Sequence, residues 1–174
     1  MIKLIILDVD GVMTNGKKTY NWDGYAISKE FCDKDWTAIK RFKALGVNVV
    51  FLSGDKFNKK IAQNRNITFW HNELPKETYL NSICLHLNVM PEEVAYAGDD
   101  LFDVEISKLV GYKYCPADAV IEMKDICTII GANGGDNFVM HLFNHLYLRS
   151  LIPRWTDSHV KIMYELDNKE VKSV

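Results

Sequence analysis

The sequence of 174 residues contains few cysteines, and their arrangement excludes two common kinds of site. No two of them form a CxxC pair, which argues against a zinc ribbon and against a dithiol redox motif. Three of the four lie in apolar stretches, where a free cysteine behaves as a small buried hydrophobic residue. We therefore expect reduced thiols and a cytoplasmic protein. The cysteines are Cys32, Cys84, Cys115 and Cys127.

An excess of charge and a long hydrophobic run are also missing. The formal net charge is −2, so the composition predicts no basic surface of the kind that binds nucleic acid or an anionic membrane. The N-terminal apolar run is too short to cross a membrane, and it lacks a signal-peptide cleavage site. We expect no nucleic-acid and no membrane partner, and an anionic ligand would have to be bound by local groups.

The first apolar run ends in two aspartates, which is unusual for a buried strand. In the stretch KLIILDVDGVMTNG, Asp8 and Asp10 follow a run of aliphatic residues, and Gly11 comes next. Charged carboxylates are unfavourable to bury, so a strand that carries two at its end usually points them at a cation or a reactive group. Gly11 allows the backbone to turn sharply there and to approach a ligand closely.

Short apolar runs alternate with helical patterns along the chain. This alternation is typical of an α/β fold with a parallel sheet and right-handed crossovers. Asp23-Gly24 between two alternating segments predicts a β-hairpin after the first strand. One domain is expected over residues 1–148, with a tail over 149–174 whose last residues are predicted to be disordered. The predicted strands are 2–7, 47–54, 67–71, 92–100, 111–115 and 127–130, and the predicted helices are 36–45, 57–66, 76–87, 101–110 and 137–148.

Three of the predicted strands end in polar or acidic residues. In an open parallel sheet, ligands bind beyond the carboxyl ends of the strands, so these residues should meet in one crevice. Several carboxylates repel one another unless a cation neutralises them, and oxygen ligands at this density suit Mg²⁺. The residues are Asp8 and Asp10 after the first strand, Ser53 and Gly54 after the second, and Asp99, Asp100 and Asp103 after the fourth.

These acids fit phosphoryl transfer through an aspartyl-phosphate. We expect Asp8 to attack phosphorus. Asp10 would protonate the leaving alkoxide and later take a proton from the hydrolytic water. The predicted magnesium ligands are Asp8, the backbone carbonyl of Asp10, and Asp99.

Phosphate binding is assigned to Ser53, to backbone N–H groups at Gly54 and to Lys76, which follows a proline at a helix start. Lys76 could instead be a solvated helix lysine. Asp103 and Asp100 are predicted to orient a ligand or a metal-bound water. Alternatively, they are acids that stabilise a helix N-terminus.

Three further residues are candidate substrate contacts. Thr14 could hydrogen-bond near the acids or simply be a loop hydroxyl. Asp55 and Lys56 follow the second strand, where exposed charges at a helix start are also common without any ligand.

Four motifs in order, DVDGVMT, LSG, Lys76 and GDDLFD, resemble those of the haloacid dehalogenase (HAD) superfamily of phosphatases. The hairpin, the lack of a cap insert and the GG before the last helix resemble its small capless branch. That branch hydrolyses 3-deoxy-D-manno-octulosonate 8-phosphate or nonulosonate (KDN, N-acylneuraminate) 9-phosphates. The resemblance implies a Rossmann-like three-layer fold, Mg²⁺ and a phosphorylated sugar acid as substrate, in lipopolysaccharide or sialic-acid biosynthesis. It also implies a homotetramer in which neighbouring subunits complete the site. The tail over 149–174 is a candidate for contact with a neighbouring subunit.

Within this resemblance, substrate choice stays open. Asp55 stands where octulosonate phosphatases commonly carry arginine, and it favours a nonulosonate, as does the stretch YCPADA. Departures from the branch pattern lie on the sugar side and leave the phosphoryl chemistry intact, so another small phosphate ester is an alternative. The departures are Asn15, Trp36, Asn133 and Met140.

Two other hypotheses compete with an enzyme. The chain could be a catalytically weak relative that serves as a binding or scaffolding subunit, but unused clustered carboxylates would destabilise it. It could also be a receiver-like domain with a stored phosphate. An acid two residues after Asp8, together with GDDLFD, favours rapid hydrolysis instead.

Overall fold

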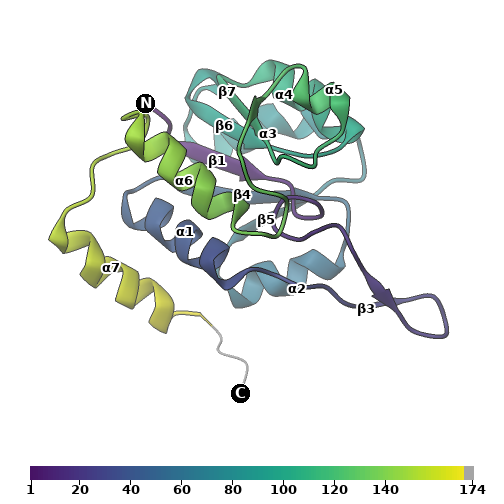
Figure 1. Ribbon diagram of the computed structural model, residues 1–174. Helices are drawn as coiled ribbons and strands as arrows, with labels where there is room; N and C mark the ends of the chain where they lie inside the picture. The colour runs from purple at the N-terminus through teal and green to yellow at the C-terminus, as the bar shows by residue number, and fades with distance from the viewer. Residues whose placement is uncertain (171–174) are drawn as a thin grey trace.

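The protein is a three-layer α/β structure. The structure, a computed structural model, describes residues 1–170. A parallel sheet forms the middle layer, and helices cover both of its faces (Figure 1). The predicted α/β fold is confirmed, and residues 1–170 contain no inserted cap domain. The strands of the sheet are β1 (Leu4–Leu7), β4 (Asn48–Ser53), β5 (Thr68–His71), β6 (Val94–Ala97), β7 (Tyr112–Cys115) and β8 (Thr128–Ile129).

Alternation along the strands divides the core between the two faces. Ile5 of β1 packs with the residues of α1 and α6, whereas its neighbour Ile6 packs with those of α3 and α4. Both faces are buried, which explains why the strands read as continuous apolar runs. The helices are α1 (Asp33–Ala44), α2 (Phe57–Asn64), α3 (Glu77–Leu87), α4 (Val104–Leu109), α5 (Ile121–Lys124), α6 (Phe138–Leu148) and α7 (Asp157–Asn168).

The strand order is β5-β4-β1-β6-β7-β8, and all neighbours are parallel. The chain builds from β1 outwards to β4 and β5, and then returns to the other side of β1 to form β6. This reversal places a crevice at the carboxyl ends of β1, β4 and β6, where open α/β sheets bind their ligands.

The hairpin projects from the body of the molecule (Figure 1). It consists of β2 (Thr19–Tyr20) and β3 (Ala26–Ser28), which pair antiparallel, so the predicted hairpin at Asp23-Gly24 is confirmed. Its aromatic residues are solvent-exposed, and Trp22 at the turn has no shielding at all.

The predicted helices differ from the observed ones mainly at their ends and in length. The helix predicted over 101–110 begins as a 3-10 turn, η2 (Leu101–Asp103), because the Asp100 side chain accepts the N–H of Leu101 and starts a tight turn. Three elements were not predicted: η1 (Pro91–Glu93), α5 and α7. The first two are very short, and α7 buries none of its residues, so it lacks a strong apolar periodicity.

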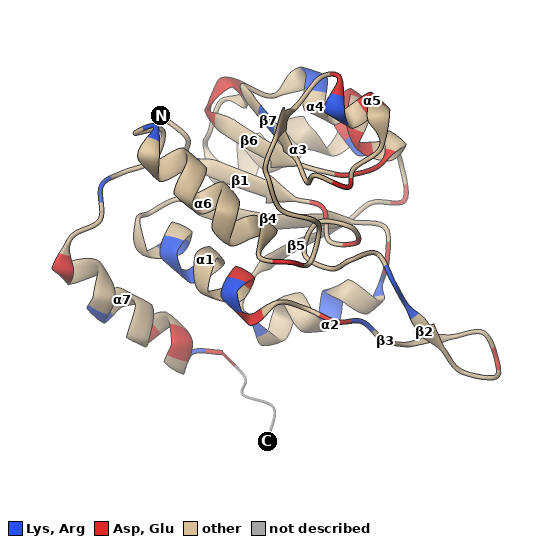
Figure 2. Cartoon of the chain, viewed as in Figure 1, with Lys and Arg blue, Asp and Glu red and all other residues tan. Residues whose placement is uncertain are grey.

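The segment after α6 folds back onto the same body. Ile152 is buried in the core, and the N–H of Ile2 donates to the carbonyl of Leu151 at 2.9 Å. Helix α7 packs against α1, where Lys40 pairs with Asp167 and Glu170. Figure 2 shows acidic residues near the C-terminal end of α7. The predicted disorder at the end of the tail concerns 171–174, outside the described residues.

Residues 1–170 include no helix that is both long enough and apolar enough to span a membrane.

Candidate active site

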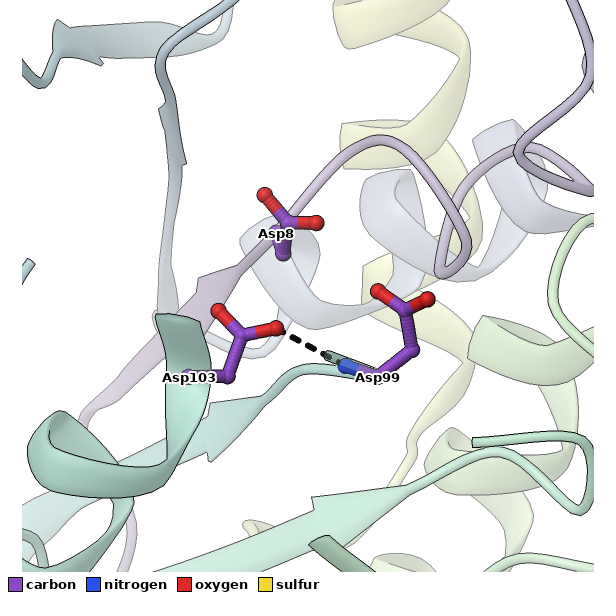
Figure 3. Close-up of side chains that lie close together, drawn as sticks. All are labelled: Asp8, Asp99 and Asp103. Atoms are coloured by element: carbon purple, nitrogen blue, oxygen red, sulfur yellow. Dashed lines mark hydrogen bonds between the residues drawn. The ribbon is translucent and has the colours of Figure 1, made fainter. Parts of the chain in front are cut away.

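An acidic cluster of Asp8, Asp99 and Asp103 lies at the carboxyl ends of β1 and β6. Asp8 directly follows β1, Asp99 lies two residues beyond β6, and Asp103 ends η2. Each carboxylate contributes an oxygen such that these oxygens lie within 4.8 Å of one another. Figure 3 shows the three side chains pointing towards the same region beyond the strand ends. The topology thus brings together acids that are far apart in the sequence.

Lys76 neutralises part of this cluster. It lies immediately before α3, and its Nζ donates to Asp8 Oδ1 at 2.7 Å and to Asp103 Oδ1 at 2.6 Å. The side chain is almost fully buried, so it is not a solvated helix lysine. Burial alone would lower the pKa of Lys76, but the carboxylates of Asp8 and Asp103 outweigh it and raise that pKa.

Asp103 uses both of its oxygens within the protein. Oδ1 accepts hydrogen bonds from Lys76 and from the Tyr96 hydroxyl at 2.5 Å. Oδ2 accepts the backbone N–H groups of Asp99 and Asp100 at 2.9 and 3.1 Å (the first drawn in Figure 3). Asp103 therefore fixes the loop that carries Asp99, whereas its orienting role towards a ligand or a metal-bound water stays a prediction.

The other two acids are poorly compensated. Burial raises the pKa of Asp8 to about 7 despite the opposing effect of Lys76. Burial, together with the charges of Asp8 and Asp103, raises the pKa of Asp99 to about 8. In addition, Asp99 Oδ1 is buried and has no hydrogen-bond partner among residues 1–170. An unpaired buried oxygen beside a second carboxylate is the donor set that a hard divalent cation requires, so the site fits Mg²⁺.

The carboxylate of Asp10 has partners of its own, from the hairpin and from α2. Lys29 Nζ donates to both of its oxygens, at 2.7 and 2.9 Å, and Asn58 Nδ2 donates to Oδ2 at 3.2 Å. Lys18 Nζ lies 3.5 Å from the same oxygen. Only the backbone carbonyl of Asp10 was predicted to bind the metal, and that assignment stays a prediction.

Ser53 ends β4 and is linked to the same network. Its hydroxyl accepts from Asn58 Nδ2 at 3.0 Å and from the N–H of Asp55 at 3.3 Å, which leaves its own proton available for a ligand. Asp55 pairs with Lys18 at 2.8 Å and with Lys29 at 2.7 Å. Burial acts in the opposite direction, but these two lysines keep the pKa of Asp55 well below its usual range.

A pocket of about 810 Å³ opens over these groups. It brings together most of the residues predicted for the site, and it adds an apolar edge at Leu74 and Phe102, both exposed. The lining residues predicted from the sequence are Asp8, Asp10, Ser53, Gly54, Asp55, Lys56, Lys76, Asp100 and Asp103.

Thr14 takes a different place. It is fully buried in the loop after β1, where its hydroxyl accepts the N–H groups of Gly16 and Gly11 at 3.2 and 3.4 Å. These contacts shape the loop that carries Asp10, and Thr14 is not part of the described pocket lining. Nor are the positions that depart from the branch pattern: Asn15, Trp36, Asn133 and Met140.

Several residues that hydrogen-bond to the predicted acids or to Ser53 were not predicted from the sequence: Lys18, Lys29, Asn58 and Tyr96. The two lysines lie on the arms of the hairpin, and no spacing in the sequence shows where a hairpin folds. Asn58 carried a weak signal, because it lies in the first turn of the helix that follows Ser53. Tyr96 was hidden in an apolar strand.

Comparisons with known proteins agree with this geometry. A family model described as haloacid dehalogenase-like hydrolase matches residues 54–143. The 3-deoxy-D-manno-octulosonate 8-phosphate phosphatase of Haemophilus influenzae is 33% identical over 138 residues, 77% of this chain and 76% of the relative. A cobalt-bound structure of the deoxy-D-mannose-octulosonate 8-phosphate phosphatase from Haemophilus influenzae aligns with a TM-score of 0.79 at 30% identity, covering 84% of this chain and 88% of that one.

A structure from Moraxella catarrhalis of a 3-deoxy-D-manno-octulosonate 8-phosphate phosphatase, in complex with magnesium, phosphate and KDO, aligns with a TM-score of 0.75. It covers 96% of this chain and 90% of that one, at 22% identity, so the likeness concerns the fold alone.

Proposed function

The chain belongs to the haloacid dehalogenase-like hydrolases, and from that premise we propose that it is a magnesium-dependent phosphatase acting on a phosphorylated sugar acid. The observation that carries the proposal is the acidic cluster: Asp8 next to Asp99, with an unpaired buried oxygen and Lys76 beside them. A relative more than 30% identical is a phosphatase of this substrate class.

The first half-reaction uses Asp8 and Asp10. An oxygen of Asp8 forms a bond to phosphorus while the bond from phosphorus to the ester oxygen breaks. Asp10 gives its proton to that oxygen, so the sugar leaves as a neutral alcohol. In the second half, Asp10 takes a proton from a water that attacks phosphorus. The bond from phosphorus to the Asp8 oxygen breaks as the water oxygen bonds to phosphorus, so inorganic phosphate leaves and the Asp8 carboxylate is regenerated.

The other residues bind and orient the phosphate. The Ser53 hydroxyl and the N–H of Gly54 would donate to phosphate oxygens, while Lys76 holds the Asp8 carboxylate and balances the charge. Mg²⁺ bound by Asp8, Asp99 and the Asp10 carbonyl would supply charge neutralisation between the nucleophile and the anionic phosphate.

Two substrates lead the proposal. The first is 3-deoxy-D-manno-octulosonate 8-phosphate, because the relatives at 30% identity or more carry that name. The second is a nonulosonate 9-phosphate, because the pocket has an acid at Asp55. The substrate is tested by measuring phosphate release from both esters and from a panel of about a hundred other phosphate esters. The substrate is the ester with the highest kcat/KM.

The mechanism is tested with Asp8→Asn. The amide cannot attack phosphorus, so we expect kcat to fall by at least about a thousandfold, a typical loss on removing a covalent nucleophile. EDTA should abolish phosphate release by the wild-type protein, and added Mg²⁺ should restore it. Lys59 is exposed on α2, and Lys59→Met serves as the control that keeps wild-type rates. Turnover by Asp8→Asn near the wild-type rate would contradict an aspartyl-phosphate.

The proposal includes a homotetramer, which the apolar hairpin supports. An exposed apolar face of this kind is typical of an interface with another chain. Light scattering coupled to size exclusion should give a mass four times that of one chain, and Trp22→Ser with Tyr25→Ser should reduce it. A monomeric wild-type protein at micromolar concentration would contradict this part. The exposed hairpin side chains are Tyr20, Trp22, Tyr25 and Ile27.

A further inference from the structure

We propose that Lys29 is a positioning residue that aims the Asp10 carboxyl group, an inference that rests on the proposed function. Lys29 follows the last residue of β3, so the returning arm of the hairpin delivers it to the site. Its side chain has 0% exposure and is absent from the described lining of the pocket, so it acts from behind Asp10 and does not meet substrate.

The ammonium group of Lys29 is surrounded by hydrogen-bond acceptors. Nζ donates to Asp10 Oδ1 and Oδ2, to Asp55 Oδ2 and to Asn58 Oδ1, all between 2.7 and 2.9 Å. The ring of Phe57 lies 5.3 Å away, on one side of the charge. A fully buried ammonium must be compensated by its partners, which in turn are fixed in place by it. Lys29 thus allows the Asp10 side chain a single orientation.

The same contact joins the proton-transfer group to the phosphate-binding group. Asn58 accepts from Lys29 through Oδ1, and its Nδ2 donates both to Asp10 and to Ser53. Lys29, Asn58, Asp10 and Ser53 therefore form one hydrogen-bonded unit. Figure 2 shows basic residues where the two arms of the hairpin meet the body, and these arms carry Lys18 and Lys29.

Lys18 provides the comparison within the same hairpin. It also pairs with Asp55, but its side chain is partly exposed and lines the pocket. It lies 3.5 Å from Asp10, against 2.7 Å for Lys29. We expect Lys18→Met to raise KM through weaker substrate binding, with similar effects on all phosphate esters.

The test uses the leaving group. An alkoxide must receive a proton as it departs, whereas p-nitrophenolate departs without one, so only the alkyl ester depends on a well-aimed Asp10. The value of kcat/KM includes steps only up to departure of the leaving group, so the later role of Asp10 as base does not enter. We compare 3-deoxy-D-manno-octulosonate 8-phosphate, or the alkyl sugar phosphate that the wild-type protein hydrolyses fastest, with p-nitrophenyl phosphate.

For Lys29→Met we expect kcat/KM to fall about a hundredfold with the alkyl ester and less than about threefold with p-nitrophenyl phosphate, because general acid catalysis contributes on that scale. Lys29→Arg, which keeps the charge, should recover most of the loss. An equal loss with both esters would mean a merely structural role and would overturn the proposal, as would no loss.

Removal of a buried charge can prevent folding. In that case the charge-balanced pair Lys29→Met with Asp55→Asn is compared with Asp55→Asn alone, with the same two esters. If the wild-type protein hydrolyses neither ester, the proposed function fails. The role of Lys29 is then tested by comparing crystal structures of the wild-type protein and Lys29→Met. An Asp10 carboxyl group that changes rotamer in Lys29→Met supports the positioning role, and one that stays in place refutes it.

Discussion

At the residue scale, Gly11 and Asp99 depend on each other although 88 positions separate them. Gly11 has φ +88°, a conformation that other residues rarely adopt. A Cβ at this position would lie 2.0 Å from Asp99 Oδ2, well inside van der Waals contact. Any side chain at position 11 would therefore push Asp99 out of the acidic cluster. The turn at Gly11 could be predicted from the sequence, but the acid that approaches it could not, because that contact depends on the position of β6 beside β1.

Gly11→Ala should consequently remove metal binding as well as activity. We expect kcat to fall by roughly a hundredfold or more, the penalty for a displacement of about 1 Å in an active site. Mg²⁺ titration by calorimetry should show weaker binding in the variant. Gly16→Ala is the matched control, because Gly16 also has a positive φ, of +72°, yet a Cβ there would lie 3.9 Å from its nearest neighbours. Equal losses in the two variants would attribute the effect to backbone strain instead of to Asp99.

At the element scale, α1 supplies the cap for α6. The residue before α6, Asn137, has φ +61° and makes no side-chain cap. Asp35 of α1 takes this role, since its Oδ1 accepts the N–H of Met140 at 3.0 Å. Its Oδ2 is buried and has no hydrogen-bond partner among residues 1–170. A helix N-terminus favours a carboxylate, but burial without a second partner opposes ionisation.

The buried carboxyl group of Asp35 should therefore make the stability of the protein depend on pH. Burial raises its pKa from 3.8 to about 6, against the effect of the Met140 N–H and of nearby His141. Because the folded state holds this proton more tightly, its stabilising contribution is complete below about pH 4 and is lost as pH rises through 6. The shift corresponds to at most about 3 kcal/mol, and we expect about 1 to 3 kcal/mol.

Asp35→Asn keeps an acceptor for Met140 but cannot ionise. Relative to wild type, its free energy of unfolding in urea should improve by about 1 to 2 kcal/mol between pH 4.5 and pH 8, because the unfolded-state carboxyl is already mostly ionised at pH 4.5. Asp33→Asn, at an exposed position in the same first turn, should show a far smaller change. A difference between Asp35→Asn and wild type that is the same at both pH values would contradict the ionisation of a buried Asp35.

Most elements, but not their contacts, could be predicted from the sequence. The apolar runs of β1, β4 and β6 identified a parallel sheet, and parallel strands must gather Asp8, Ser53 and Asp99 at one edge. Residues at strand ends could thus be placed together from the sequence, because the parallel topology puts the carboxyl ends of the strands at one edge of the sheet. The hairpin was also predicted, but its direction depends on tertiary contacts, so Lys29 could not be placed beside Asp10 from local pattern alone.

At the scale of the whole molecule, the folded domain extends beyond α6. The predicted boundary at residue 148 follows the extent of the family resemblance and the end of the last predicted helix, and it stays a prediction. Yet Ile152 is buried, Leu151 and Trp155 pack against the core, and the ring of Trp155 lies 5.4 Å from the Arg41 guanidinium. Helix α7 has no buried residue; its Asp167 pairs with Lys40 of α1, and Glu170, just beyond the helix, pairs with Arg65.

Two truncations separate these contributions. A chain of residues 1–156 loses α7 and its ion pairs, which are worth up to about 1 kcal/mol each at a surface. A chain of residues 1–148 also loses Ile152, and burial of one such side chain contributes about 1.5 to 3 kcal/mol. We expect 1–156 to lose about 1 to 2 kcal/mol in free energy of unfolding, and 1–148 to lose at least about 1.5 kcal/mol more.

Urea unfolding and phosphate release, measured on the same preparations, check this expectation. The acidic cluster lies at the strand ends, whereas α7 packs against α1, so 1–156 should keep its Mg²⁺ requirement and its rate as a folded chain. Equal stability of the two truncated chains would show that residues 149–156 add nothing to the core. A rate lost in 1–156 despite unchanged folding would instead make α7 part of the catalytic assembly, as expected if the tail completes the site of a neighbouring subunit.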